Sequence, residues 1–145
     1  MLTIEQAGPE AVDELAADLH PDDSAELAAA GVDLRTGISP ECQALRWRGQ
    51  LVALFGLVAH PLRQDAGIPW MLCTNVLAQV PKRAMAAISR RVVADWQQQR
   101  AHLVNMVHRR NARALGFVRW LGFTVDETPT GPKSEFFIFH WSAHV

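Results

Sequence analysis

The side chains best able to do chemistry in this chain are basic, and they gather in residues 80–120. That stretch holds nine Lys and Arg residues and one acid, Asp95, so it carries +8 while the rest of the chain carries −9. A basic face of this kind could bind phosphate groups. The alternative is that the basic and acidic faces balance each other within one fold. The nine residues are Lys82, Arg83, Arg90, Arg91, Arg100, Arg109, Arg110, Arg113 and Arg119.

Few other residues suit acid–base or nucleophilic chemistry. His102 and His108 flank a short apolar stretch and could exchange protons near neutrality, although a lone histidine at a strand end is more often structural or exposed. Cys73 and Ser89 are further candidates to donate a proton, and the stretch Trp70–Asn75 offers no carboxylate as a base. The chain contains no Tyr, which excludes any mechanism that needs a phenol.

Length and composition favour one domain over residues 1–145. With 49% hydrophobic and 20% charged residues, the chain is unlike disordered or fibrous proteins. Cys42 and Cys73 lack metal-ligand spacing, so we expect buried free thiols and no metal site. The N-terminus lacks the pattern of a signal peptide, and the longest apolar stretch, Leu51–Ala59, is too short to cross a bilayer. We therefore expect a soluble, intracellular protein.

The elements that must position these residues alternate between strands and helices. We expect loops over residues 32–40 and His60–Pro69, and a hairpin turn at Gly49-Gln50. The alternation of strands and helices predicts an α/β (α+β) fold, with a mixed sheet of about six or seven strands and about four helices on both faces. The expected strands are Leu2–Ala7, Cys42–Arg48, Leu51–Ala59, Trp70–Asn75, His102–Val107, Phe123–Asp126 and Glu135–Trp141. The expected helices are Ala11–Leu19, Ala25–Ala30, Pro81–Arg100 and Asn111–Leu121.

The stretch from His108 to Phe123 carries the most informative pattern. Asn111 is a plausible helix N-cap, and Gly122 is a plausible stop before a strand that begins with Phe123. With Ala114 and Phe117, these residues resemble the fourth conserved motif of the GNAT acetyltransferases in type and spacing. The order of the expected elements is also similar to the GNAT order. The alternative is a generic capped helix followed by a strand.

The resemblance implies an acetyl-CoA site at the start of the long helix. GNAT proteins bind the pyrophosphate there with a loop of the type Gln/Arg-x-x-Gly-x-Gly/Ala, and this chain reads Gln79-Val-Pro-Lys-Arg-Ala84. Lys82 replaces a glycine and Pro81 removes one N–H donor, so the implied site is degenerate. Lys82 and Arg83 could pair with phosphates directly, or could be solvated charges at a helix end. The implied cofactor-binding residues are Gln79, Lys82, Arg83, Ala84, Met85 and Asn111.

The residues that would catalyse transfer are not identified by the resemblance. GNAT enzymes commonly use a Tyr as general acid one residue after the position of Phe117, and here that residue is Val118. We therefore assign no catalytic residue. Direct transfer from a thioester to an amine does not strictly require a strong acid, so activity stays open.

A narrower resemblance is to the GNAT-like proteins of short-tailed phages and prophages that include their internal virion protein A. It rests on Gly67–Thr74, on Lys82-Arg83 in place of glycines, on Leu103–Val107 and on Asn111 with Arg119–Phe123. It implies a virion-associated or interaction protein with little or no catalysis, in the host cytoplasm or the virion, with a phage or host protein as partner.

Two alternatives stand beside the phage interpretation. One is an acetyl-CoA-dependent N-acetyltransferase that acts on an unidentified amine. The other is a nucleic-acid binder, which no recognised motif supports and which a net charge of −1 disfavours. Asn105, on a buried strand, needs partners for its amide, so we expect a structural hydrogen bond there. The oligomeric state and the acceptor substrate cannot be derived from these patterns.

Overall fold

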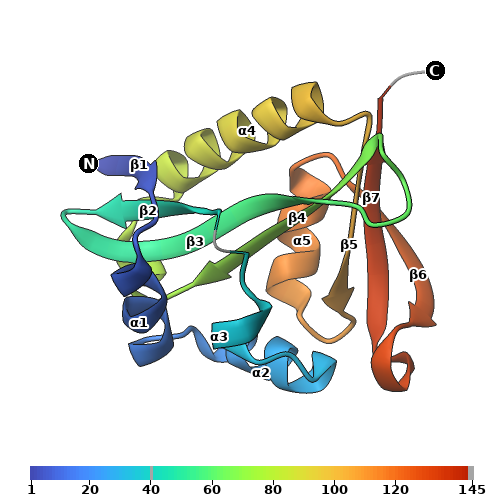
Figure 1. The fold of residues 1–145 in the computed structure, drawn as a ribbon, viewed down its shortest axis with the longest axis horizontal. Helices are drawn as coiled ribbons and strands as arrows, with labels where there is room; N and C mark the ends of the chain where they lie inside the picture. The colour runs from blue at the N-terminus through green and yellow to red at the C-terminus, as the bar shows by residue number, and fades with distance from the viewer. Residues whose placement is uncertain (40, 144–145) are drawn as a thin grey trace. The chain divides into compact units, whose positions relative to one another are not determined.

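The computed structural model describes residues 1–39 and 41–143 of the chain. Their strands form a seven-stranded mixed sheet in the order β1-β2-β3-β4-β5-β7-β6, accompanied by five α-helices (Figure 1). The predicted α/β class with a mixed sheet is therefore confirmed. The residues group into two compact units: unit 1 comprises 1–57 and 70–87, and unit 2 comprises 58–69 and 88–145. A single domain over residues 1–145 stays a prediction.

Unit 1 is built around an antiparallel three-stranded arrangement with β2 between β1 and β3. Its core includes Leu15, Leu51 and Leu54, all nearly inaccessible to solvent, each of which stabilises the fold by roughly 1.5–3 kcal/mol. The elements are β1 (Leu2–Gln6), α1 (Pro9–Ala17), α2 (Pro21–Ala30), α3 (Leu34–Gly37), β2 (Gln43–Trp47) and β3 (Gln50–Ala59).

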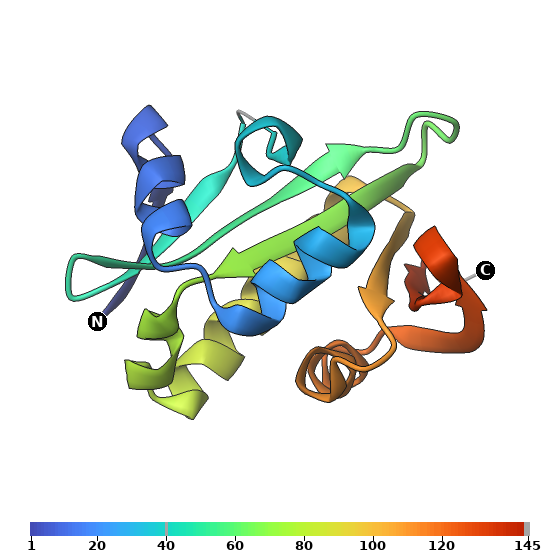
Figure 2. The ribbon, with the colours of Figure 1, turned by 90° about the horizontal axis from the view of Figure 1, so that it is seen from below.

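A two-residue turn joins β2 to β3, and Figure 2 shows this hairpin, in teal and green, lying across the view. Arg48 and Gly49 occupy the turn with φ of 52° and 82°. Positive φ at both central residues is what a hairpin with right-handed strand twist requires. The predicted turn at Gly49-Gln50 was one residue too late, because Arg48 adopts a conformation that a β strand cannot contain.

Two more local predictions in unit 1 were wrong. The helix expected from Ala25 begins at Pro21, because proline suits the first helical position, where no N–H is needed; His20 caps it by accepting the Asp22 N–H. The expected loop over residues 32–40 contains the short helix α3, which Asp33 caps by accepting the Arg35 N–H. Pro40, at the end of that expected loop, lies outside the described residues.

The sheet continues through β4 (Ala66–Cys73), followed by a short 3-10 turn (Asn75–Gln79) and α4 (Lys82–Gln99). β4 begins four residues before the expected start, inside the predicted loop His60–Pro69. Ala66 and Gly67 enter the sheet because they pair in parallel with β5, and that long-range pairing leaves no local sequence signal. The helix predicted over Pro81–Arg100 is confirmed within one residue at each end.

Unit 2 contains β5 (His102–His108), α5 (Ala112–Trp120), β6 (Thr124–Thr130), a short 3-10 turn (Pro132–Ser134) and β7 (Phe136–Ser142). β7 pairs antiparallel with both β5 and β6. Phe123 and Phe139 pack edge to face in its core, with ring centroids 5.1 Å apart. Among the described helices of the whole chain, none is both long and apolar enough to cross a membrane.

Candidate active site

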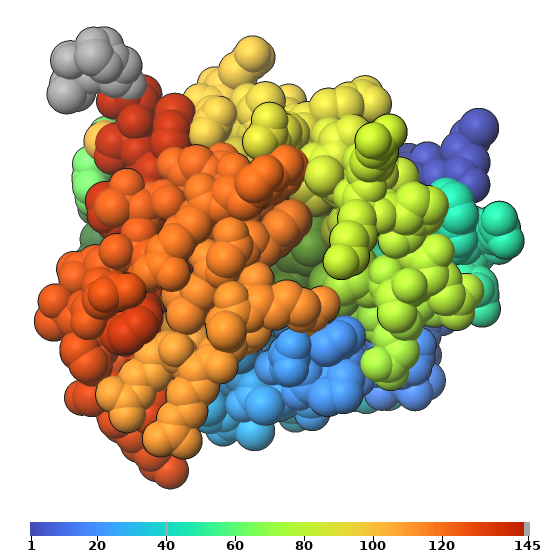
Figure 3. All heavy atoms as spheres, turned by 180° about the vertical axis from the view of Figure 1, so that it is seen from behind, coloured from blue at the N-terminus to red at the C-terminus, as the bar shows by residue number. Residues whose placement is uncertain are grey.

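The start of α4 is a basic, exposed helix N-terminus. Lys82 and Arg83 are exposed, and the first turn, all of which the structure describes, holds no acidic residue. The Met85 N–H donates to the Pro81 carbonyl at 3.1 Å. The N–H groups of residues 82–84 come before this bond, in the part of a helix where N–H groups have no carbonyl one turn earlier to bond to. Figure 3 shows this segment, in yellow-green, at the molecular surface. Such a helix end attracts anions through both its backbone and its side chains.

Thr74 positions this helix start. Its hydroxyl is buried and donates to the Leu51 carbonyl at 2.5 Å, while the Val76 N–H donates back to the Thr74 Oγ1 at 3.2 Å. The Thr74 N–H also bonds to the Val52 carbonyl at 2.8 Å. These contacts anchor the turn after β4 on β3, so that the chain enters α4 from a rigid strand.

The implied cofactor residues are distributed over both units. Gln79, Lys82, Arg83, Ala84 and Met85 form one run in unit 1, with Gln79 exposed and with Ala84 and Met85 half-buried. Asn111 belongs to unit 2 and is the N-cap of α5, where its Oδ1 accepts the Ala114 N–H at 3.2 Å. The predicted capping role of Asn111 is confirmed, and its contact with a cofactor stays a prediction.

A carboxylate that sequence reasoning missed lies at the C-terminal end of β4. The Cys73 N–H donates to Asp23 Oδ2 at 2.7 Å, and the His20 N–H donates to the Cys73 carbonyl at 2.8 Å. The start of α2 is thereby tied to the end of β4 within unit 1. The sequence around Asp23 indicated only a capped helix, since nothing local says which strand a helix will meet. Asp23 supplies the carboxylate that residues 70–75 lack.

The other sequence candidates for catalysis have different surroundings. Ser89 is buried in α4, with no hydrogen-bond partner for its hydroxyl among the residues that the structure describes. Val118 is a half-buried residue of α5. Burial raises the pKa of the Cys42 thiol, which keeps it protonated and unreactive. Asn105 makes the expected structural hydrogen bond, from its amide to the Pro69 carbonyl at 2.6 Å.

Some residues of the basic stretch are engaged within unit 2. Arg119 pairs with Glu127 at 2.8 Å, Arg100 donates to the Gln64 carbonyl at 2.7 Å, and the Arg90 guanidinium lies 3.9 Å from the centroid of the Trp120 ring. The acidic N-terminal stretch has cations of its own. Arg46 binds Glu14 and Glu5, and Arg35 binds Asp13. The two charge clusters are thus satisfied in part by local partners.

Comparison with solved structures decides the fold. The acetyltransferase of the GNAT family from Streptococcus pneumoniae matches with a TM-score of 0.64 at 11% identity, over 99% of this chain and 100% of that chain. The acetyltransferase from Thermus thermophilus matches with a TM-score of 0.67 at 15% identity, over 98% of this chain and 97% of that chain. The chain has the GNAT fold. The predicted fold is thereby confirmed.

One GNAT-fold match carries a cofactor. The PaiA N-acetyltransferase from Thermoplasma acidophilum, solved in complex with coenzyme A, matches with a TM-score of 0.65 at 13% identity, over 98% of this chain and 99% of that chain. Identities this low show the shared fold alone. No protein-family model matches the chain, and no curated protein matches it.

Proposed function

We propose that this chain is an N-acetyltransferase that takes an acetyl group from acetyl-CoA and transfers it to a primary amine. The observation that carries the proposal is the basic, acid-free first turn of α4 in a chain with the GNAT fold. A GNAT-fold protein with coenzyme A bound supports the choice of cofactor. Acetyl-CoA would supply a thioester whose carbonyl carbon accepts the amine.

The residues present fit a phosphate-bearing cofactor, although charged side chains here take the place of the glycine backbone of the usual GNAT loop. Lys82 and Arg83 are exposed and can pair with the pyrophosphate by charge-assisted hydrogen bonds. The glycine that Lys82 replaces would let the backbone approach the phosphates closely, so binding here relies more on side chains. Gln79, Ala84 and Met85 border the same turn, and Asn111 completes the proposed set.

Proton transfer is assigned to Asp23. Its carboxylate is fixed at the end of β4 by the Cys73 N–H and can take the proton that an ammonium must lose before it attacks. The chain holds no Tyr to protonate the departing thiolate, so we assign that proton to water. The acidic start of α2 suits a cationic acceptor.

A second candidate is a phage or prophage protein of the GNAT fold that acts by interaction, in the virion or the host cytoplasm, with little or no catalysis. It is favoured by the absence of Tyr, by Val118 at the position of the usual acid, and by Pro81 at the cofactor loop. Its partner would be a phage or host protein, and its cofactor site would be degenerate.

Calorimetry on the full chain with acetyl-CoA tests the binding half of the proposal. We expect micromolar affinity, weakened at least about tenfold by the double reversal Lys82→Glu/Arg83→Glu, because two phosphate partners become repulsive. Arg91→Glu is the matched control, since it reverses an exposed charge on the same helix beyond its first turn. No binding at millimolar acetyl-CoA would contradict the proposal.

Release of free coenzyme A thiol with a panel of primary amines then separates the two candidates. Asp23→Asn should lower turnover by about a hundredfold while acetyl-CoA affinity stays the same. Glu10→Gln, which neutralises an exposed acid in the first turn of α1, should leave turnover close to wild type. Binding without turnover on any amine would favour the interaction protein.

A further inference from the structure

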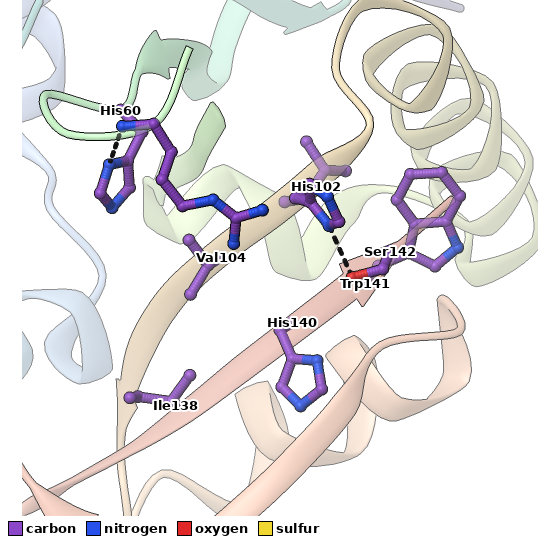
Figure 4. Close-up of a pocket in the computed structure, with 9 residues that line it drawn as sticks. His60, His102, Val104, Ile138, His140, Trp141 and Ser142 are labelled. Atoms are coloured by element: carbon purple, nitrogen blue, oxygen red, sulfur yellow. Dashed lines mark hydrogen bonds between the residues drawn. The ribbon is translucent and has the colours of Figure 1, made fainter. Parts of the chain in front are cut away.

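Unit 2 contains a cavity of about 310 Å³ to which the proposed acetyl transfer assigns no role (Figure 4). Its lining includes His60, His102, His140, Arg63 and Ser142. Among the described residues, His, Cys, Asp and Glu side chains form no group that could hold a metal ion.

Three polar groups in and beside the cavity lie in a row because of strand register. His102 at the start of β5 stands directly opposite Ser142 at the end of β7. Asp65 immediately precedes Ala66, the β4 residue paired with His102, and the His102 N–H donates to the Asp65 carbonyl at 3.1 Å. Pairing between β5 and β7 thus fixes His102 opposite Ser142, and the backbone hydrogen bond from His102 holds Asp65 in the turn just before β4.

The side chains of the row form a relay in which each lies within hydrogen-bond or ion-pair distance of the next. His102 Nδ1 lies 2.8 Å from Ser142 Oγ, and His102 Nε2 lies 3.3 Å from Asp65 Oδ2. A dashed line marks the His102–Ser142 hydrogen bond in Figure 4. A carboxylate only accepts hydrogen bonds, so we assign the ring proton of neutral His102 to Nε2. Nδ1 then has a lone pair, and the Ser142 hydroxyl donates to it.

We infer that Ser142, His102 and Asp65 form a second catalytic site that hydrolyses small carboxylic esters through an acyl-serine. Ser142 Oγ attacks the ester carbonyl carbon while its proton passes to His102 Nδ1. The tetrahedral adduct collapses, the C–O bond to the alcohol breaks, and His102 returns the proton to the leaving alcohol. Water then attacks the acyl-serine by the same route, which releases the acid and regenerates Ser142.

The surroundings of the relay fit this reaction. Arg63 lines the cavity, with its Nε 3.5 Å from Asp65 Oδ1, and its guanidinium can offset the negative charge that develops on the carbonyl oxygen. Val104 and Ile138 add apolar wall for an acyl chain. Ser142 is exposed, so both ester and water reach it.

Covalent labelling of the full chain with diisopropyl fluorophosphate tests the nucleophile. We expect one adduct, mapped by peptide mass to Ser142, forming at least about a hundredfold faster than any adduct on exposed Ser134 of the same unit. His102→Gln should slow labelling by a similar factor. His108→Gln, at the other end of β5, should leave the rate unchanged. Labelling of Ser142 no faster than Ser134, or unaffected by His102→Gln, would overturn the inference.

Asp65 acts through His102, as a positioning residue, and needs its own test. Asp65→Asn presents an amide N–H to Nε2, which moves the ring proton to Nδ1 and removes the acceptor for Ser142. Labelling should fall at least about tenfold in Asp65→Asn and recover in Asp65→Glu, whereas equal rates in the two variants would show a merely structural role. Hydrolysis of p-nitrophenyl acetate should fall to the uncatalysed rate in Ser142→Ala, and an unchanged rate would also overturn the assignment.

Discussion

The two ends of β5 carry the same histidine–carboxylate pair in two different settings. At one end, His102 Nε2 faces Asp65 and Nδ1 faces the Ser142 hydroxyl. At the other, His108 Nε2 lies 3.0 Å from Glu135 Oε2, and the Arg110 N–H donates to Nδ1 at 3.1 Å. Both rings therefore have a carboxylate on Nε2 and a donor on Nδ1.

Whether the donor on Nδ1 is a backbone N–H or a hydroxyl decides whether the histidine has a structural or a catalytic role. A backbone N–H cannot become a nucleophile, so the relay at His108 closes the turn between β5 and α5. A hydroxyl can, so the same relay at His102 ends in a reactive atom. Packing agrees with the difference, because His108 meets the buried Phe136 edge to face at 5.3 Å while His102 opens onto a cavity. A histidine is thus better judged by the partner of each nitrogen than by its carboxylate alone.

The largest expected effect is on stability. His108→Ala should lower the free energy of unfolding by about 2–3 kcal/mol, because it opens a gap beside the buried Phe136 and removes the part-buried hydrogen bond to Glu135. His102→Ala should cost less than about 1 kcal/mol, since its carboxylate partner is half exposed. Urea denaturation followed by Trp fluorescence measures both. Equal losses of unfolding free energy in the two variants would mean that the two histidines do not differ in their structural role.

A smaller effect isolates the packing part of the difference. In a double-mutant cycle, His108→Ala and Phe136→Leu should show a coupling energy of about 1 kcal/mol, because the edge-to-face contact exists only when both rings are present. The same cycle with His102→Ala and Phe136→Leu should give a coupling near zero. Coupling of similar size in both cycles would mean that Phe136 does not distinguish the two histidines.

The smallest effect is a dependence on acid. The hydrogen bond from His108 is the main cause that lowers the pKa of Glu135, with Lys133 and Arg110 nearby adding to it. A lowered folded-state pKa stabilises the protein above the ordinary glutamate range, and this stabilisation is lost as pH falls through the folded value. The urea midpoint should therefore fall between about pH 6 and pH 3, and fall less in Glu135→Gln. Glu127→Gln, on β6, serves as the control. If the urea midpoint depends on pH equally in Glu135→Gln and Glu127→Gln, the His108–Glu135 pair is not the cause of the acid dependence.

Local signals predicted the elements whose boundaries depend on one or two residues. Asn111 caps α5 and Gly122, with φ of 100°, ends it, as the amide side chain and the backbone freedom of glycine dictate. The helix expected over Ala11–Leu19 instead runs from Pro9 to Ala17, because proline suits the first helical position. The early start of β4 was missed because Ala66 is a strand residue only by virtue of its pairing with His102. The run at the start of α4 was found through a resemblance to a family, and its ligand contacts remain predictions.

The catalytic relay could not be predicted in the same way. Sequence reasoning singled out His102 as a residue that could exchange protons, but Ser142 lies 40 positions away and Asp65 lies just before a third strand. Their meeting depends on the register of β5 against β7 and of β4 against β5, which hydrophobic patterns do not specify to the residue. Asp23 was missed for the same reason, since a helix start gives no indication of which strand end it will meet.

The edge strand β6 affects how readily this chain would aggregate at high concentration. β6 ends the strand order, so one of its sides presents unpaired backbone groups that could template another molecule. It carries Asp126, Glu127 and Pro129, and its register shifts between Asp126 and Thr130. Like charges repel a second copy, and proline withholds a ladder donor. The free edge of β6 is therefore a poor template for a strand of another molecule, and we do not expect aggregation to begin there.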